Sequence, residues 1–353
     1  MKNKILAALL TGTLIGASML PYHAFAADYD NSQTTEKKYV SGTEYEQDDI
    51  VYILYKTDEP RLRVKEWKAD KREAVVPETV EGIIVDSIGN SAFIKKENLI
   101  RVELPSTIRE INDHAFEDCS NLRTVNFPAC LEKLDSASFN GCTALRDVKL
   151  NRCLTSIGLC AFQSCSKVNS LTIPGYVETL SSHVCQMMTG LYTLRLCNGV
   201  KKVVGEAALN DYDQKRIIIP PSVEELEPYS LGYRFHSGNY DGITNTKIFG
   251  VKNTEAERYA HANKIPFVEF DFKYGDMDND GKVTSVDASM VLQEYVSRSS
   301  GKHEKGFTEA QELKADINDD FVIDSADASA IMAYYVYLSS GGDYTPEEYF
   351  FCS

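Results

Sequence analysis

Apolar and polar residues follow one regularly repeating pattern between positions 83 and 231. The fullest copy reads Ile157-Gly-Leu-Cys-Ala-Phe-Gln-Ser-Cys165, and earlier copies begin at Ile88, Ile111 and Leu134, which sets a 23-residue period. Three apolar columns keep this spacing without an insertion: Leu99, Leu122, Leu145, Val168 and Leu191; Val102, Val125, Val148, Leu171, Leu194 and Ile217; Leu104, Phe127, Leu150, Ile173, Leu196 and Ile219. One unit of this length cannot bury its own apolar face, whereas stacked units share a continuous core. The pattern therefore predicts a solenoid.

Each unit contains two candidate strands and one corner. The Val-x-Leu step alternates apolar and polar residues, so it predicts a short strand with Val102 and Leu104 pointing inward. A second short run, Ile108–Ile111, follows the proline at position 105. The Ala-Phe-x-x-Cys step suits a tight helical turn that places its Phe in the core. We therefore expect one or two parallel ladders of short strands.

The two ends of a solenoid need covers, and both flanks of the repeats break the regular register. Strand-like runs at Ile50–Tyr55 and Leu62–Val64 predict an N-terminal cap, and polar residues 27–44 predict a flexible lead before it. At the other end, Ile248–Gly250 and the helix-like stretch Ala256–Ala260 predict a C-terminal cap. The capped solenoid should therefore span residues 45–268, with an insertion rich in Gly and Asn at residues 233–245.

The residues between the inward columns would line any binding face on the strands. They are Arg101, Glu103, Thr124, Asn126, Asp147, Lys149, Ser170, Thr172, Thr193, Arg195 and Arg216. This row either binds a ligand or is a solvated strand surface. It has no stripe of Trp or Tyr of the kind that stacks on sugar rings, which weakens a carbohydrate-binding interpretation.

Two 12-residue acidic loops follow the solenoid, the first beginning at Asp276 and the second at Asp316. In the first, the predicted calcium ligands are Asp276, Asp278, Asp280, the backbone carbonyl of Lys282, and Asp287. In the second, they are Asp316, Asn318, Asp320, the carbonyl of Val322, and Asp327. Calcium takes about six to eight oxygen ligands, and this spacing wraps one loop around one ion. The sequence therefore predicts two calcium ions.

A helix is predicted after each loop, at Ala288–Val296 and Ala328–Leu338, with a middle helix at Phe307–Lys314. Position 12 is Asp in both loops, in place of the bidentate Glu of an EF-hand. The second loop has Phe321 where position 6 usually requires Gly and a positive φ. A bulky residue there costs about 1–2 kcal/mol, so the second site should be weaker or distorted.

The first 26 residues read as a secretory signal peptide, with Lys2 and Lys4 before an apolar stretch and a cleavage site after Ala26. The alternative is a membrane anchor, for which the apolar stretch is short. Cleavage would change the net charge from −15 to about −17, which disfavours binding to nucleic acid or anionic membranes. We therefore expect an exported protein without a membrane span.

Nine cysteines in an exported chain raise the question of disulfides. Cys119, Cys142 and Cys165 recur with the repeat, and so do Cys130 and Cys153. Cysteines that keep step with a structural repeat are most simply interpreted as small, buried side chains, with one or more disulfides as the alternative.

The repeats resemble the BspA-type leucine-rich repeats of bacterial surface and secreted proteins, over roughly residues 45–268 and on the Ile-Gly-x-x-Ala-Phe-x-x-Cys-x-x-Leu unit. This resemblance implies a leucine-rich-repeat solenoid that binds a protein or glycan or mediates adhesion, without naming the ligand.

The paired loop-helix units resemble a type I dockerin over residues 275–342, followed by a tail at 343–353. The implied fold is a small all-α module. Its implied partner is a cohesin domain on a scaffold protein, bound through Ser285 and Val286 or through Ser325 and Ala326. Tyr274 near one end and Tyr344, Tyr349 and Phe350 near the other are candidates to clasp the two termini together.

Three functions follow from these features. The first is a non-catalytic interaction protein, secreted and recruited to a cellulosome. The second is a carbohydrate-active enzyme with its site on the repeats, since most dockerin carriers are such enzymes. No His-Glu-x-x-His or Gly-x-Ser-x-Gly motif supports catalysis, and no catalytic residue is assigned. The third is a cell-surface adhesin.

Overall fold

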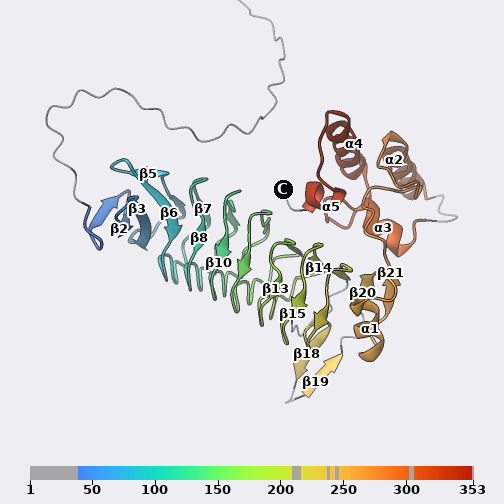
Figure 1. Cartoon of the computed structure of the whole chain (residues 1–353), viewed down its shortest axis with the longest axis horizontal. Helices are drawn as coiled ribbons and strands as arrows, with labels where there is room; N and C mark the ends of the chain where they lie inside the picture. The colour runs from blue at the N-terminus through green and yellow to red at the C-terminus, as the bar shows by residue number, and fades with distance from the viewer. Residues whose placement is uncertain (1–38, 209–215, 237–238, 243–245, 302–305, 352–353) are drawn as a thin grey trace, which may run out of the picture. The chain divides into compact units, whose positions relative to one another are not determined.

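A computed structural model describes residues 39–208, 216–236, 239–242, 246–301 and 306–351. The predicted signal peptide and most of the predicted lead lie outside the described residues. From Tyr39 onward the chain forms one compact unit. Figure 1 shows its short strands stacked coil upon coil, followed by a group of helices.

The N-terminal coils begin with an antiparallel cap. Its strands are β1 (Glu44–Gln47), β2 (Ile50–Lys56) and β3 (Arg61–Trp67), and β3 pairs in parallel with β6 (Ile83–Ile88), which also pairs with β5 (Thr79–Val80). The strand-like runs expected in this region thus form the cover of the first repeat.

Two parallel ladders run through the repeats, as the apolar columns predict. One is divided into two sheets: the first has β6, β8 (Glu110–Ile111), β10 (Lys133–Leu134) and β11 (Ser156–Ile157), and the second has β13 (Thr179–Leu180), β15 (Lys202–Val203) and β17 (Glu225–Leu226). The other is divided likewise: the first sheet has β4 (Glu73–Val75), β7 (Arg101–Glu103) and β9 (Thr124–Val125), and the second has β12 (Ser170–Ile173), β14 (Thr193–Leu196), β16 (Arg216–Ile219), β20 (Lys247–Gly250) and β21 (Phe267–Glu269). Ser170 pairs in register with Thr193, and Thr193 with Arg216, each one sequence period further along the chain. The sequence repeat is therefore the coil of the solenoid.

The corner between the ladders is formed by tight turns with left-handed residues, such as His114 and Asp118 at φ 57°. Residues of positive φ cannot continue a right-handed helix, so the predicted helical turn is wrong. The turns stack instead: the Phe93 N–H donates to the Ala115 carbonyl at 2.8 Å, and the Phe116 N–H donates to Ser138 in the same way.

The corner phenylalanines form a continuous column in the core. Phe93, Phe116, Phe139 and Phe162 are fully buried, and their successive ring centroids are 4.8, 5.0 and 5.6 Å apart. Trp67 of the cap extends the column, 5.7 Å from Phe93. Each coil therefore buries its aromatic ring against the next one.

The cysteines fall into two groups. Cys119, Cys142 and Cys165 are buried, and their thiols donate to the Phe93, Phe116 and Phe139 carbonyls. Cys130 and Cys153 are exposed, so the interpretation of that pair as buried core residues is wrong. They lie before β10 and β11, outside the inward columns. Besides Cys197, the cysteines among the described residues are free thiols.

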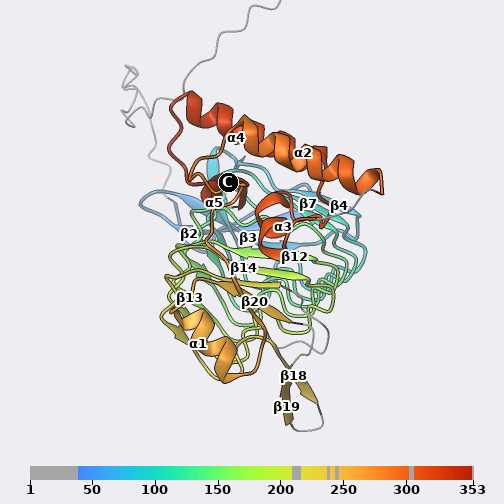
Figure 2. The same ribbon diagram turned by 90° about the vertical axis from the view of Figure 1, so that its right-hand side faces the viewer.

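The C-terminal coils are closed by α1 (Glu255–Ala262), which packs against β20 and β17. The insertion forms an antiparallel hairpin of β18 (Tyr233–His236) and β19 (Asn239–Gly242). Beyond β21 come α2 (Ser285–Ser299), α3 (Glu309–Ala315), α4 (Ser325–Ser339) and α5 (Pro346–Phe351). Helices α2 and α4 pack against each other. Figure 2 shows the C-terminal coils and these helices from the side.

A second apolar core joins this helical module to the repeats. Ile218 and Phe249, on β16 and β20, belong to the same buried cluster as Phe270, Tyr274 and Leu313. The helical module is therefore packed on the strand ladder rather than tethered beside it.

Candidate calcium centre

The first acidic loop precedes α2 and is shaped by its own side chains. The Asp278 carboxylate accepts the Asp280 N–H at 3.0 Å, and the Asp280 carboxylate accepts the Lys282 N–H at 2.8 Å. Gly281 takes φ +86°, in the left-handed region that Gly adopts readily. These bonds curl the backbone of the loop into a tight turn.

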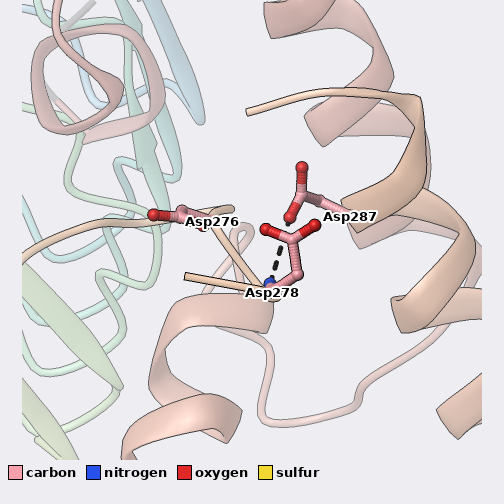
Figure 3. A group of neighbouring side chains, drawn as sticks. All are labelled: Asp276, Asp278 and Asp287. Carbon is pink, nitrogen blue, oxygen red and sulfur yellow. Dashed lines mark hydrogen bonds between the residues drawn. The ribbon is translucent and has the colours of Figure 1, made fainter. Parts of the chain in front are cut away.

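Three carboxylates of this loop converge (Figure 3). One oxygen from each of Asp276, Asp278 and Asp287 lies within 4.8 Å of the others. Asp287 is also fixed by the backbone, because it accepts the Met277 N–H at 2.7 Å and the Thr284 N–H at 2.7 Å. Asp276 and Asp287 are buried, whereas Asp278 is exposed at the rim.

One oxygen of Asp276 indicates what the cluster binds. Its Oδ2 accepts the Gly281 N–H at 3.1 Å, but its buried Oδ1 has no hydrogen-bond partner. A buried anionic oxygen without a partner is costly. Carboxylate oxygens at this spacing are the ligands that calcium prefers. The first loop therefore fits a calcium ion at these three carboxylates. Asp280 is not among the carboxylates that converge, and it stays a predicted ligand, as does the carbonyl of Lys282.

The second loop repeats the same backbone arrangement before α4. The Asn318 side chain accepts the Asp320 N–H at 3.0 Å, and Asp320 accepts the Val322 N–H at 2.8 Å. Asp327 is held by the Ile317 N–H at 2.9 Å. Phe321 takes φ +68° at position 6, as the pattern requires.

Asp316 distinguishes the second loop from the first. Its Oδ1 accepts the Phe321 N–H at 3.4 Å, while its Oδ2 accepts a bond from Arg216 Nη1 at 3.2 Å. Burial, together with the neighbouring Asp319 carboxylate, raises the pKa of Asp316 to about 7, and Arg216 acts in the opposite direction. Sequence reasoning placed Arg216 on the strand row and did not connect it with the loop.

The predicted cohesin-contacting residues occupy equivalent places at the starts of α2 and α4. Ser285, Val286, Ser325 and Ala326 are all exposed. Each helix start is fixed by a capping box, through Thr284 in α2 and Asp324 in α4. Both helix starts are thus capped and accessible.

The strand row is divided between two environments. Arg101, Glu103, Thr124, Asn126, Asp147 and Lys149 line a groove of about 710 Å³. Ser170, Arg195 and Arg216 instead contact the second loop, so for these three the prediction of an open binding face is wrong. Thr172 is half-buried, and Thr193 is buried.

The C-terminal tail forms α5, which sequence reasoning missed. Tyr274 packs edge-on against Phe351 of α5, with ring centroids 4.8 Å apart. Tyr344 and Tyr349 pack on Tyr337 of α4. The rings predicted to meet Tyr274 thus pack on α4 instead, including Phe350, which lies on Tyr334. The two ends meet through Phe351, which was not among the predicted residues.

Two family models match the chain. Residues 86–215 match the BspA type leucine rich repeat region in six copies, and residues 274–335 match the dockerin type I domain. The chain thus combines BspA-type leucine-rich repeats with a C-terminal type I dockerin. A type I dockerin binds calcium and implies association with a cohesin in an extracellular cellulosome. Neither module is catalytic.

Several solved structures resemble the chain. A leucine rich cell surface protein from Faecalibacterium prausnitzii is 20% identical, covering 60% of this chain and 73% of its own, with a TM-score of 0.48. A leucine-rich repeat protein from T. pallidum is 22% identical, covering 64% and 98%, with a TM-score of 0.45. One from Bacteroides ovatus is 22% identical, covering 64% and 67%, with a TM-score of 0.43.

No curated protein matches the chain. Within the described residues, no helix has both the length and the apolar character needed to cross a bilayer.

Proposed function

We propose that this chain is a secreted, non-catalytic interaction protein whose dockerin binds a scaffold cohesin in a calcium-dependent way and thereby brings the repeats to a cellulosome. The observation that carries the proposal is the convergence of Asp276, Asp278 and Asp287, with one buried oxygen left without a partner. This arrangement lies directly before an exposed helix start in a matched dockerin.

Calcium, when bound, would neutralise the negative charge of the buried carboxylates. Asp276, Asp278, Asp280, Asp287 and the Lys282 carbonyl would hold it in the first loop. Asp316, Asn318, Asp320, Asp327 and the Val322 carbonyl would hold it in the second. Because these ligands span the turn before each helix, ion binding fixes the start of α2 and of α4.

The two helix starts are the proposed cohesin surfaces. Ser285 and Val286 in one half match Ser325 and Ala326 in the other, and all four are exposed while the module is packed on the repeats. Val286 leaves 55% of its surface exposed. An exposed apolar side chain beside a serine suits a protein partner that buries a small patch.

The ligand of the repeats is proposed to be a protein that binds in the strand groove. The groove presents both charge signs, with Arg101 and Lys149 beside Glu103 and Asp147. Mixed charges on a rigid ladder favour a partner with complementary charges over a sugar, which binds largely by stacking on aromatic rings.

Calorimetric titration of the purified protein with a panel of scaffold cohesins tests the docking role. Binding should be tight in calcium and vanish in chelator. Charged substitutions at Ser285 and Val286 should weaken cohesin binding if the first half contacts the cohesin. Those at Ser325 and Ala326 should weaken it if the second half does. Glu225→Gln, a change on the repeats away from both helix starts, should leave it unaltered. If no cohesin binds although calcium does, the docking role is wrong.

A further inference from the structure

Two arginines of the repeats bind the second acidic loop. Arg195 on β14 is fully buried, and its guanidinium donates two hydrogen bonds to the Asp319 carboxylate, at 2.6 and 3.0 Å. Its Nε donates to the Tyr274 hydroxyl at 3.2 Å, and its guanidinium carbon lies 3.5 Å from the centre of the Phe351 ring. The Ser170 hydroxyl donates to the same Asp319 carboxylate at 3.1 Å. A buried arginine that forms a bidentate ion pair with a carboxylate makes a strong and directional contact.

Arg216, in register beside Thr193 on the neighbouring strand β16, reaches the first ligand position of the same loop. Its Nη1 donates to Asp316 Oδ2 at 3.2 Å, and its side chain is only 14% exposed. Phe321 packs on Tyr192 with ring centroids 4.2 Å apart, and the Arg216 guanidinium lies 5.6 Å from the centre of the Phe321 ring. The loop is thus held by charge and by apolar contact together.

The two loops differ at the positions that face the repeats. At position 4, Asn279 of the first loop accepts a bond from Lys314 within the helical module at 2.6 Å, whereas Asp319 of the second loop binds Arg195. At position 6, a side chain added at Gly281 would meet open space, whereas Phe321 packs on Tyr192. The second loop therefore carries an acid and an aromatic ring where contact with the repeats requires them.

The carboxylates at loop position 1 also differ in whether they contact the repeats. In each loop, one oxygen of this Asp accepts the N–H of position 6. The other oxygen has no partner in Asp276, but in Asp316 it accepts the bond from Arg216. A guanidinium on this oxygen competes for its lone pairs and repels a divalent cation by Coulomb's law.

We propose that Arg195 and Arg216 form a clamp that holds the second calcium loop on the strand face of the repeats, and that Arg216 lowers the calcium affinity of this loop below that of the first. The inference rests on the proposed calcium ligands. The clamp fixes the dockerin on the repeats while Ser325 and Ala326 stay exposed for a cohesin.

Calcium titration of the full chain by calorimetry tests the effect of Arg216. Asp276→Asn and Asp316→Asn assign each binding step to its loop. Wild type should bind calcium more weakly at the second loop, and Arg216→Gln should strengthen that step about tenfold and leave the first unchanged. Lys247→Gln is the matched control, because Lys247 pairs with Glu309 of α3, away from the loops. It should shift neither step.

Hydrogen exchange of the wild-type chain in chelator provides a second test that needs no variant. The amides of both loops donate to side-chain oxygens of their own loop. The clamp therefore predicts that, without calcium, the amides of Asp320–Val322 exchange more slowly than those of residues 280–282. Equal exchange in both loops, or an Arg216→Gln chain with unchanged or weaker calcium binding at the second loop, would overturn the clamp. Absence of calcium binding at both loops would instead refute the proposed calcium sites.

Discussion

The pair between Arg195 and Asp319 can be tested by changing Asp319 to Asn. Asp319 occupies loop position 4, which supplies no proposed calcium ligand, so the change separates the interface from ion binding. Asn is also the residue at the equivalent position of the first loop, and both positions are left-handed, with φ 61° at Asn279 and 56° at Asp319. Asn tolerates this conformation. The substitution therefore removes a charge without adding backbone strain.

The expected cost follows from the burial of Arg195. Removing one partner of a buried ion pair typically costs about 3–5 kcal/mol, because the remaining charge stays in a low-dielectric site. Arg195 is 0% exposed, but it keeps the Tyr274 hydroxyl, and the Asn side-chain oxygen still accepts one bond. We therefore expect the low end, about 3 kcal/mol, which corresponds to about a 100-fold change in an opening equilibrium.

Hydrogen exchange at Asn198 reports that opening. Its backbone N–H donates to the Glu347 carboxylate of α5 at 2.8 Å, across the interface between the repeats and the helical module. Asp319→Asn should speed its exchange about 100-fold. Glu225→Gln removes an exposed pair with Lys202 and serves as control, because a solvent-exposed ion pair contributes little to stability. If both variants exchange alike at Asn198, the buried pair does not hold the interface.

Three further results are expected. Phe139→Ala removes a fully buried ring from the column and should lower the free energy of unfolding by about 3–5 kcal/mol in urea, whereas a loss below about 1 kcal/mol would contradict a tightly packed column. Removing calcium from the full chain with chelator should reduce its helical circular dichroism, since the ion organises the starts of α2 and α4; an unchanged spectrum would contradict this. In a folded Cys352→Ser variant, a thiol reagent should label Cys130 and Cys153, which are exposed. It should spare Cys142, because burial raises the pKa of that thiol well above its ordinary value.

The solenoid was predictable because its signal is redundant. Each column contributes several residues at the same spacing, and the register partners of the ladders are separated by that same spacing. The helix after each acidic loop was predictable for a similar reason, since the loop pattern and the apolar spacing agree. The corner was predicted wrongly as a helical turn, because left-handed residues such as His114 have no sequence signature.

The packing of the dockerin on the repeats was missed, although the sequence carries a signal for it. The position between the two inward residues of each strand is polar in the early coils, as at Glu103, Asn126 and Lys149. It becomes Ile218 and then Phe249 in the last two, where both are buried by the helical module. Apolar outward residues on successive strands indicate a second packed layer. Spacing alone could not show that Arg195 would be buried too, because its partner Asp319 lies 124 residues away.

Phe321 shows why the second loop departs from the calcium pattern. As an isolated loop, it carries a strain of about 1–2 kcal/mol, since a bulky residue at φ +68° is disfavoured where Gly would be free. In the folded chain, the same ring packs on Tyr192 and lies near the Arg216 guanidinium, and ring contacts of this kind offset about 0.5–1.5 kcal/mol. The strain and the contact are therefore of similar size, so packing on the repeats offsets much of the strain. A loop selected for calcium alone would have kept Gly at this position. The presence of Phe321 beside Asp319 is thus better explained by docking within the chain than by ion binding.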